Sequence, residues 1–432
     1  MARAIVNHAP DILYSDESTL TVDGRFLHVH FKPDYTREMI LSQNYICHFG
    51  VYRREIALEA GGFRPNFEGS QDHDFLLRCL QQATSIFHVT RMLYYWRAVP
   101  GSTAARFENK NHAWAAGRRA VASAASAVSS ACEVEFGKNP GTYRVIHPRP
   151  ALPSVTIIIP FRDEPEMLNA CLASLEETLP AEGLRILGVD NQSAEKETTN
   201  LMQEWSCKSS RVQFLTYDHP FNYAAINNFA ARHANTKHLL LLNNDVTAIE
   251  SGWLEEMVSL SELRDVGAVG AKLLYPDDTL QHAGVIMGIG GVAGHSHKGL
   301  PDNMPGYFCR PSIHQNVSAV TGACLMVKAD LFRRIGGLKE RDLGVAFNDV
   351  DFCLRLIEAA YSNVYTPHAT LYHNESKSRG YEDTPEKRQR FYAERSYMLR
   401  RHSIALSLGD PWYNPNLTLR TEDFARREDT RP

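Results

Sequence analysis

Residues 238–246, HLLLLNNDV, combine an apolar stretch with the side chains that metal and phosphate chemistry needs. Four consecutive leucines predict a strand buried on both faces, and Asn244 and Asp245 follow where that strand ends. Ligands of open α/β sheets bind just outside the carboxyl ends of the strands. Asp245 is therefore well placed to bind a divalent cation that contacts phosphate oxygens. The alternative is that these residues only form the turn that closes the strand.

A second aspartate, Asp190, ends another apolar stretch, residues 185–190. If both strands belong to one sheet, the carboxylates of Asp190 and Asp245 can face the same crevice. A nucleotide lying there would meet Asp190 through its base or ribose, and Asp245 through a metal and its diphosphate. A turn role at the strand end is an equally good explanation for Asp190.

Asp349 and Asp351 begin a predicted helix over residues 346–356. A carboxylate at this place can act as general base toward a sugar hydroxyl, a role that we assign to Asp349, while we expect Asp351 to orient its neighbours. The alternative is that both acids only stabilise the helix N-terminus. However, residues 51–78 repeat the pattern of strand, Gly-Gly and Asp-x-Asp, which helix capping alone does not require.

His373 ends the last predicted strand, residues 364–373, and precedes a segment rich in hydroxyl groups. Ser376, Ser378 and Arg379 offer the donors of a diphosphate clamp, and His373 is a candidate third metal ligand. A polar surface loop explains the same composition equally well.

The composition of the whole chain is that of a globular protein. Its 432 residues are 22% charged with a net charge of −4, so we expect no nucleic acid partner. The eight cysteines are scattered and indicate reduced core residues, and no apolar run approaches the roughly 20 residues that span a bilayer. We therefore expect a cytoplasmic protein. Arginines in the predicted helix over residues 385–402 allow association with the inner face of the cytoplasmic membrane, although a solvated face explains them better.

The order of predicted elements defines the fold class. From residue 151 onward strands alternate with helices, which predicts an α/β domain with a mostly parallel central sheet and helices on both faces. We divide the chain into a partial α/β module at residues 1–104, a helical connector and linker at 105–150, the complete domain at 151–405 and a C-terminal tail at 406–432.

The motifs of the second half of the chain resemble those of a known family. Residues 155–417 are similar to inverting, GT-A-fold glycosyltransferases of family 2, in the branch of bacterial O-antigen and polysaccharide enzymes that includes rhamnosyltransferases. The resemblance is carried, in order, by VTIIIPFRDEPEMLNACLASL, GVDNQS, FNYAAINNFA, LLLLNNDV, AVTGACLMVKADLF, AFNDVDFCLRL, YHNESKSRG and DPWYNPNLTL. The first module is similar to the second half of another such domain, through ILYSDES, GSQDHDFLLR and LYYWRAVPGSTA.

The resemblance implies roles for single residues. Pro160 and Asp190 would border the nucleotide pocket, with Asn227 nearby. The sequence Asn243-Asn244-Asp245 replaces the family's D-x-D motif, so Asp245 would carry Mg²⁺ or Mn²⁺. Asp349 falls on the catalytic base, next to an asparagine where the family has glutamate. In the first module, Asp16 and Asp72 are the counterparts of the metal ligand and the base.

The family also implies the partners, namely a nucleotide-diphosphate sugar as donor and a growing, lipid-linked glycan as acceptor. Two alternative functions remain. A sugar nucleotidyltransferase would need a Gly-rich basic loop after the first strand, where this chain has Phe161-Arg162-Asp163-Glu164-Pro165. A non-catalytic carbohydrate-binding or scaffold protein built from degenerate modules suits the first module better than the second.

Overall fold

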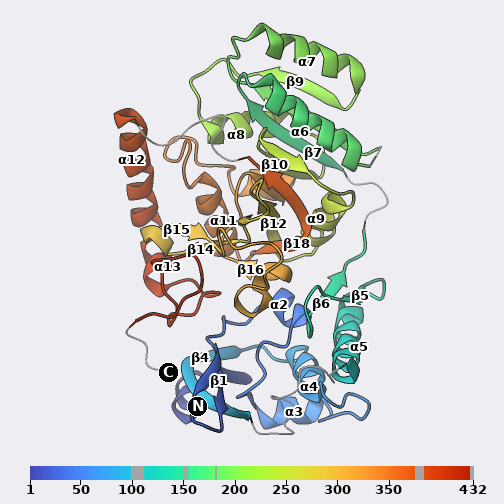
Figure 1. Ribbon diagram of the computed structural model, residues 1–432, viewed down its shortest axis with the longest axis vertical. Coiled ribbons are helices and arrows are strands. Elements are labelled where there is room, and N and C mark those ends of the chain that lie inside the picture. The colour runs from blue at the N-terminus through green and yellow to red at the C-terminus, as the bar shows by residue number, and fades with distance from the viewer. Residues whose placement is uncertain (99–110, 150–153, 181, 375–383, 429–432) are drawn as a thin grey trace. The chain divides into compact units, whose positions relative to one another are not determined.

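The chain forms two compact units, which the computed structural model describes at residues 1–98, 111–149, 154–180, 182–374 and 384–428 (Figure 1). Unit 1 comprises Met1–Pro148, Pro305–Asn316 and Gly409–Pro432, and unit 2 comprises Arg149–Met304 and Val317–Leu408. Among the described residues no helix combines the length and apolarity needed to cross a bilayer.

The parallel half of the unit 2 sheet is built from consecutive βα units. Strands β7 (Val155–Phe161), β8 (Leu184–Asp190), β9 (Val212–Thr216) and β10 (His238–Leu242) pair in parallel in the order β10-β7-β8-β9. Their carboxyl ends therefore meet at one edge of the sheet.

The other half of this sheet mixes directions. Strand β17 (Cys324–Lys328) lies antiparallel between β10 and β12 (Val266–Leu274), and β12 is parallel to β18 (Ser362–His373). Strand β11 (Val246–Ala248) pairs antiparallel with the end of β18, which sets Val246 opposite His373. The predicted α/β fold is confirmed, and its central sheet is parallel in one half and mixed in the other.

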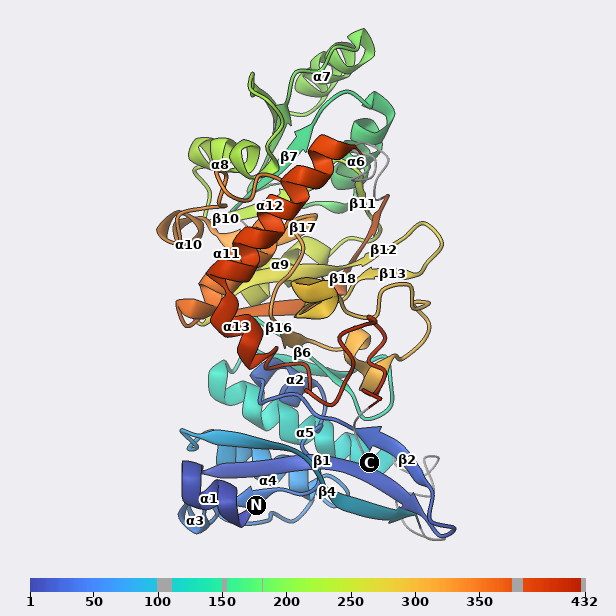
Figure 2. The same cartoon turned by 90° about the vertical axis from the view of Figure 1, so that its left-hand side faces the viewer.

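Helices cover both faces of the sheet. One face carries α6 (Pro165–Thr178), α7 (Lys196–Lys208) and α9 (Trp253–Ser261); the other carries α8 (Tyr223–His233), α10 (Ala329–Arg334), α11 (Asn348–Glu358) and part of α12 (Pro385–Arg401). Figure 2 shows α12 passing in front of α11. The short helix α13 (Ser403–Leu408) follows α12 in the chain. The remaining elements are β13 (Leu280–His282), β14 (Val285–Met287), η1 (Ile289–Gly291), β15 (Ala293–His295) and β16 (Gln315–Val317).

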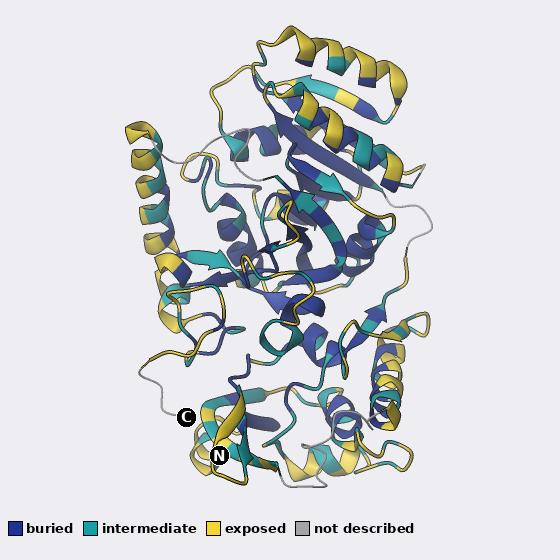
Figure 3. Cartoon of the chain, in the orientation of Figure 1, coloured by how far each residue is buried: buried dark blue, intermediate teal, exposed yellow. Residues whose placement is uncertain are grey.

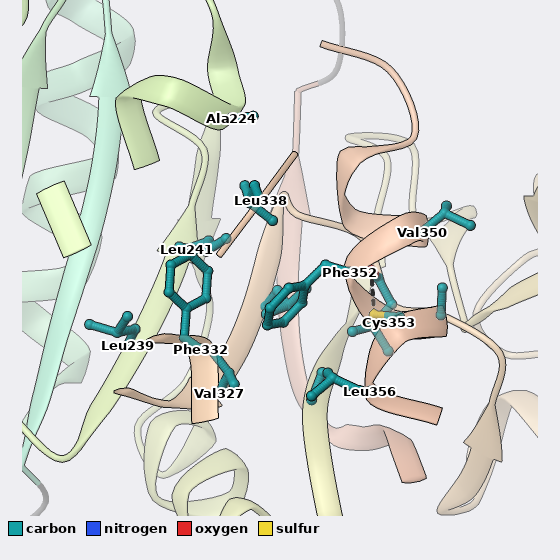
Figure 4. Packing of buried hydrophobic residues seen from close by; sticks show 14 of the residues in the cluster. Ala224, Leu239, Leu241, Val327, Phe332, Leu338, Val350, Phe352, Cys353 and Leu356 are labelled. Carbon is teal, nitrogen blue, oxygen red and sulfur yellow. Dashed lines mark hydrogen bonds between the residues drawn. The ribbon is translucent and has the colours of Figure 1, made fainter. Parts of the chain in front are cut away.

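The leucine run explains why β10 lies in the centre. Leu239 and Leu241 pack into the core on the α8–α11 face, and Leu240 and Leu242 into the core on the α6–α9 face. Side chains alternate between faces along a strand, so only an uninterrupted apolar run can bury both. Figure 3 shows β7 and β10 buried throughout, and Figure 4 shows Leu239 and Leu241 beside Phe332. The ring of Phe332 lies 5.2 Å from that of Phe352 on α11.

Unit 1 is a smaller α/β module. Strand β1 (Ile12–Thr21) pairs antiparallel with β2 (Phe26–His30) and β3 (Val51–Tyr52), and parallel with β4 (Ile86–Ala98). The other elements are α1 (Ala2–His8), α2 (Arg37–Ser42), α3 (Arg54–Glu59), α4 (Gln71–Leu80), α5 (Asn111–Val128), β5 (Glu133–Phe136), β6 (Tyr143–Ile146) and η2 (Tyr307–Ser312). The helix predicted as a connector, α5, buries Ala120, Val121 and Ala125 in the unit 1 core. It is therefore part of this unit's packing.

Candidate active site

A cavity of about 430 Å³ lies at the carboxyl ends of the parallel strands of unit 2. Its wall includes Pro160 at the end of β7, Asn191 after β8 and residues 243–245 after β10, together with His373 and Asp349. The sequence places these residues far apart, and the sheet topology brings them to one crevice, as the strand-end positions predict.

Asp245 and His373 form one corner of this cavity. The Asp245 Oδ1 atom lies 3.1 Å from His373 Nε2, and both side chains are almost fully buried. The β11–β18 pairing fixes them, and the Asn374 backbone N–H donates to the Asp245 carbonyl at 2.9 Å. Asn243 Nδ2 lies 3.4 Å from the same His373 nitrogen.

This corner fits a divalent cation. Despite its closeness to His373, Asp245 Oδ1 accepts no hydrogen bond with proper angular geometry from the described residues. A carboxylate oxygen and an imidazole nitrogen side by side are ligands that Mg²⁺ and Mn²⁺ accept, and the remaining positions can go to substrate oxygens and water. The described residues contain no group of three or more His, Cys, Asp or Glu side chains around one point. Among the described residues, the candidate donor set is therefore the side chains of Asp245 and His373.

Other buried polar atoms around the cavity also lack a protein partner among the described residues. They are Asn191 Oδ1, Asn244 Nδ2 and His373 Nδ1, in addition to Asp245 Oδ1. Buried polar groups are nearly always hydrogen-bonded in folded proteins, so a cluster of exceptions at one cavity marks a place for a polar ligand.

Asp349 lies at the first turn of α11 and faces the same cavity. Its Oδ2 atom accepts from the Gly322 backbone N–H at 2.8 Å, and Oδ1 accepts from that of Val350 at 2.8 Å. Burial nevertheless raises the pKa of Asp349 above its ordinary value of 3.8, which these two donors only partly oppose. A raised pKa suits a proton acceptor, since a stronger base takes a hydroxyl proton more readily.

The structure distinguishes among the predicted nucleotide-site residues. Pro160 and Asn244 line the cavity. Asp190 does not, because its Oδ1 atom turns back to accept from the Ser193 backbone N–H at 3.0 Å. The next residue, Asn191, lines the cavity instead. Asn227 lies fully buried behind the wall, where its Nδ2 atom donates to the Tyr223 carbonyl at 2.8 Å.

Asp351 does not reach the cavity. Its carboxylate is fully buried on the other side of α11, where it accepts from Arg355 Nε at 2.7 Å and pairs with His402 Nε2 at 2.9 Å. Arg355 also donates to the carbonyls of Ile335 and Gly337, both at 2.7 Å. In the structure Asp351 contacts Arg355 and His402, and it is not among the described residues that line the cavity.

Unit 1 repeats this arrangement, which explains the internal repeat. Asp74 accepts from Arg78 Nε at 3.0 Å, and Arg78 also donates to the carbonyls of Ala60 and Gly62. The second aspartate of each Asp-x-Asp pattern thus ties an arginine to the Gly-Gly turn of its own unit. The three predicted clamp residues Ser376, Ser378 and Arg379 lie outside the described residues.

Several cavity residues were not predicted. Tyr223 lines the cavity and donates its hydroxyl to the Gly322 carbonyl at 2.7 Å, next to the N–H that holds Asp349. His295 lines it from β15, with its Nδ1 atom 3.0 Å from that of His282. An aromatic residue at a helix start gives no sequence signal for such a role, whereas the histidine-containing GHSHKG segment did offer one.

The acidic counterpart in unit 1 has a different environment. Asp16 is fully buried in the middle of β1, and its Oδ1 atom accepts from the Lys32 backbone N–H, His88 Nε2 and Asn414 Nδ2 at 2.9 to 3.0 Å. Asn414 Nδ2 also lies 3.2 Å from Oδ2. Protein donors thus occupy the positions that a cation would need.

Comparison with known proteins finds similarity to one family and to several relatives. Residues 156–336 match the family model described as Glycosyl transferase family 2. An uncharacterized protein of Sinorhizobium fredii, y4gI, is 45% identical over 97% of this chain and 47% of its own length. The O-antigen biosynthesis protein RfbC of Myxococcus xanthus is 38% identical over 96% of this chain and 32% of its own length. The chain thus spans about half of one relative and a third of the other.

Among solved structures, the mannosyltransferase PcManGT from Pyrobaculum calidifontis, in complex with GDP-Man and Mn²⁺, is similar with a TM-score of 0.44. It is 18% identical, and the similarity covers 59% of this chain and 67% of that chain.

Proposed function

We propose that the glycosyltransferase family 2 domain of this chain transfers a sugar from a nucleotide-diphosphate donor to a hydroxyl group of a bacterial surface glycan, with inversion at the anomeric carbon. One observation carries the proposal, namely that Asp245, His373 and Asp349 lie on a single cavity at the carboxyl ends of the parallel strands. The relative named for O-antigen biosynthesis supports a surface glycan as product.

In this reaction Asp349 is the general base. Gly322 and Val350 each donate a backbone N–H to one of its carboxylate oxygens, which orients the carboxylate in the cavity wall. The acceptor hydroxyl would lose its proton to Asp349 as its oxygen forms a bond to the anomeric carbon. The bond from that carbon to the diphosphate breaks on the opposite face, so a single displacement inverts the centre.

Asp245 and His373 would hold Mg²⁺ or Mn²⁺ at the diphosphate. When bound, such a cation offsets the negative charge that develops on the departing diphosphate. Asn191 and Asn244, whose buried polar atoms lack protein partners among the described residues, would contact the nucleotide and its phosphates.

A panel of nucleotide sugars tests the proposal through ligand-dependent thermal stability. With Mn²⁺ present, the correct donor at 100 times its dissociation constant should stabilise the protein by about 2.7 kcal/mol. Asp245→Asn should lose this protection, while Asp349→Asn should keep it. A protein that is protected by none of the donors, with or without metal, would contradict a donor site in this cavity.

We propose that unit 1 is not a second catalytic centre. Asp16 makes hydrogen bonds with three protein donors, whereas Asp245 Oδ1 accepts none from the described residues. This difference favours the hypothesis of a degenerate, non-catalytic module for unit 1 only.

We also propose that the protein reaches a lipid-linked acceptor by peripheral contact with an anionic membrane. Ile404 and Leu408 on α13 are 74% and 82% exposed. Arg388 and Arg400 on α12 are exposed as well. Apolar and basic side chains together bind anionic lipid surfaces. Sedimentation with vesicles of phosphatidylglycerol should retain the wild type and lose the double variant Ile404→Ser/Leu408→Ser. Equal retention of both would remove this surface from consideration.

A further inference from the structure

The buried carboxylate of Glu394 on α12 holds the segment that leads into Asp349. Glu394 is 3% exposed although its side chain is polar, and its two oxygens accept from the backbone N–H groups of Val345 and Ala346, each at 2.9 Å. A carboxylate that receives two charge-assisted hydrogen bonds fixes both backbone groups strongly.

The segment that Glu394 holds is strained. Phe347 has φ 61° and ψ 7°, a left-handed conformation that a residue with a side chain adopts at an energetic cost. Such conformations persist only where surrounding contacts determine them. Here Asn348 Nδ2 donates to the Val345 carbonyl at 2.7 Å, and the Phe347 ring lies 5.5 Å from that of Phe391 on α12.

This segment also forms part of the cavity wall. Val345, Phe347 and Asn348 line the cavity beside Asp349. Residues 345–347 lead directly into α11, whose first turn carries Asp349.

We propose that Glu394 is a positioning residue, which fixes the strained turn at Phe347 and thereby holds Asp349 at the distance from the acceptor oxygen that proton transfer requires. The inference rests on the proposed function, because it concerns the same general base. Glu394 itself is not among the described residues that line the cavity.

Glu394 is not the only contact that holds α12 against the rest of unit 2. Met398 is buried in the core, and His402 directly after α12 pairs with Asp351. The helix can therefore remain docked when the Glu394 carboxylate is changed. A loss of activity in a Glu394 variant whose α12 stays docked therefore indicates a positioning role and not a loss of structure.

The test compares Glu394→Gln and Glu394→Asp with two controls in the full chain. Glutamine keeps one acceptor oxygen and presents an NH₂ group to the second backbone N–H, whereas aspartate keeps both acceptors on a shorter side chain. Met398→Ala removes core packing on the same helix and keeps the Glu394 carboxylate, and Glu386→Gln removes an exposed charge from the first turn. The probe reaction is hydrolysis of the nucleotide sugar that protects the wild type, with water as acceptor.

We expect kcat of Glu394→Gln to fall by roughly 10²-fold, the effect of a misplacement of about 1 Å, with the donor dissociation constant unchanged. Glu394→Asp should recover part of this loss. Met398→Ala should lower Tm at least as much as Glu394→Gln but keep kcat near that of the wild type.

Two results would overturn the inference. The first is an unchanged kcat in Glu394→Gln, and the second is a loss of kcat in Met398→Ala that matches its loss in Glu394→Gln. If instead the wild type binds and hydrolyses no nucleotide sugar, the proposed function fails before Glu394 is tested.

Discussion

At the scale of single residues, the site depends on the different environments of two carboxylates. Asp349 accepts two backbone N–H groups and has a raised pKa, while Asp245 Oδ1 accepts no hydrogen bond from the described residues and sits next to an imidazole. The first environment suits a base that exchanges a proton, and the second suits a ligand that shares a cation with the substrate.

Replacing Asp349 by asparagine should separate chemistry from binding. A general base typically contributes 10²–10⁴-fold, so turnover should fall by roughly that factor while the donor still raises Tm. Initial rates and thermal unfolding of the same preparation measure both quantities. If the variant kept its turnover, the base would have to be another residue.

The raised pKa of Asp349 also predicts the pH dependence. Asp349 must be ionised to accept a proton, so kcat/KM should fall as the pH decreases through its pKa. Because burial raises that pKa above 3.8, the fall should occur at a higher pH than for an ordinary aspartate. A pH–rate profile of the wild type checks this, with thermal unfolding as the control for acid denaturation. A rate that stays level down to pH 3.8 would contradict it.

The sequence alone contained enough information to show that Asp349 and Asp351 cannot both face the cavity. Successive residues on a helix are separated by about 100°, so side chains at positions 349 and 351 point to nearly opposite sides. Helical geometry alone could have assigned only one of the two to the cavity. By contrast, the choice between Asp190 and Asn191 depends on a hydrogen bond to Ser193 that no periodicity reveals.

At the scale of elements, the Asp351–Arg355–His402 cluster ties three segments of unit 2 together. It joins α11 to the Gly-Gly turn through Arg355 and to the end of α12 through His402. Burial tends to raise the pKa of Asp351, but the hydrogen bond from His402 and the charge of Arg355 outweigh it and lower that pKa below 3.8.

Replacing Asp351 by asparagine should therefore destabilise the fold rather than remove the chemistry. Loss of one partner from a buried ion pair typically costs about 3–5 kcal/mol, which urea unfolding at pH 7 measures. Because the native pKa is lowered, the contribution is fully present above pH 3.8 and is lost as the pH falls through the native pKa. Asp330→Asn, which removes a fully exposed partner of Arg333, is the matched control and should leave stability unchanged. Equal effects of the two substitutions would contradict the structural role.

The sequence predicted the elements better than their pairing. Apolar runs indicated β7, β8 and β10 because buried parallel strands need them, and the Thr384 cap indicated the start of α12, where the Thr384 hydroxyl accepts from the Lys387 N–H. The antiparallel insertion of β17 between β10 and β12 could not be read in this way. Strand direction depends on long-range connections that leave no mark on local periodicity.

At the scale of the whole molecule, the two units share a pattern but differ at its acidic positions. If Asp16 is saturated by protein donors and Asp245 is not, the full chain should bind a single Mn²⁺ at the acidic sites. Titration followed by electron paramagnetic resonance should show that Asp245→Ala removes this binding and that Asp16→Ala does not. Two equivalent ions in the wild type would show that unit 1 also retains a metal site.

Unit 1 is formed by three separate segments of the chain, and this limits where the protein can be cut into two fragments. Its interior includes Tyr307, whose hydroxyl accepts from the Phe31 N–H at 2.8 Å, and Arg310, which donates to the Trp412 carbonyl at 2.7 Å. A cut near residue 150 would thus leave residues 305–316 and 409–428 on the unit 2 fragment without the surfaces they pack on. Co-expression of the two pieces, rather than purification of either half, is the way to obtain a split form, and their reassociation should need both segments.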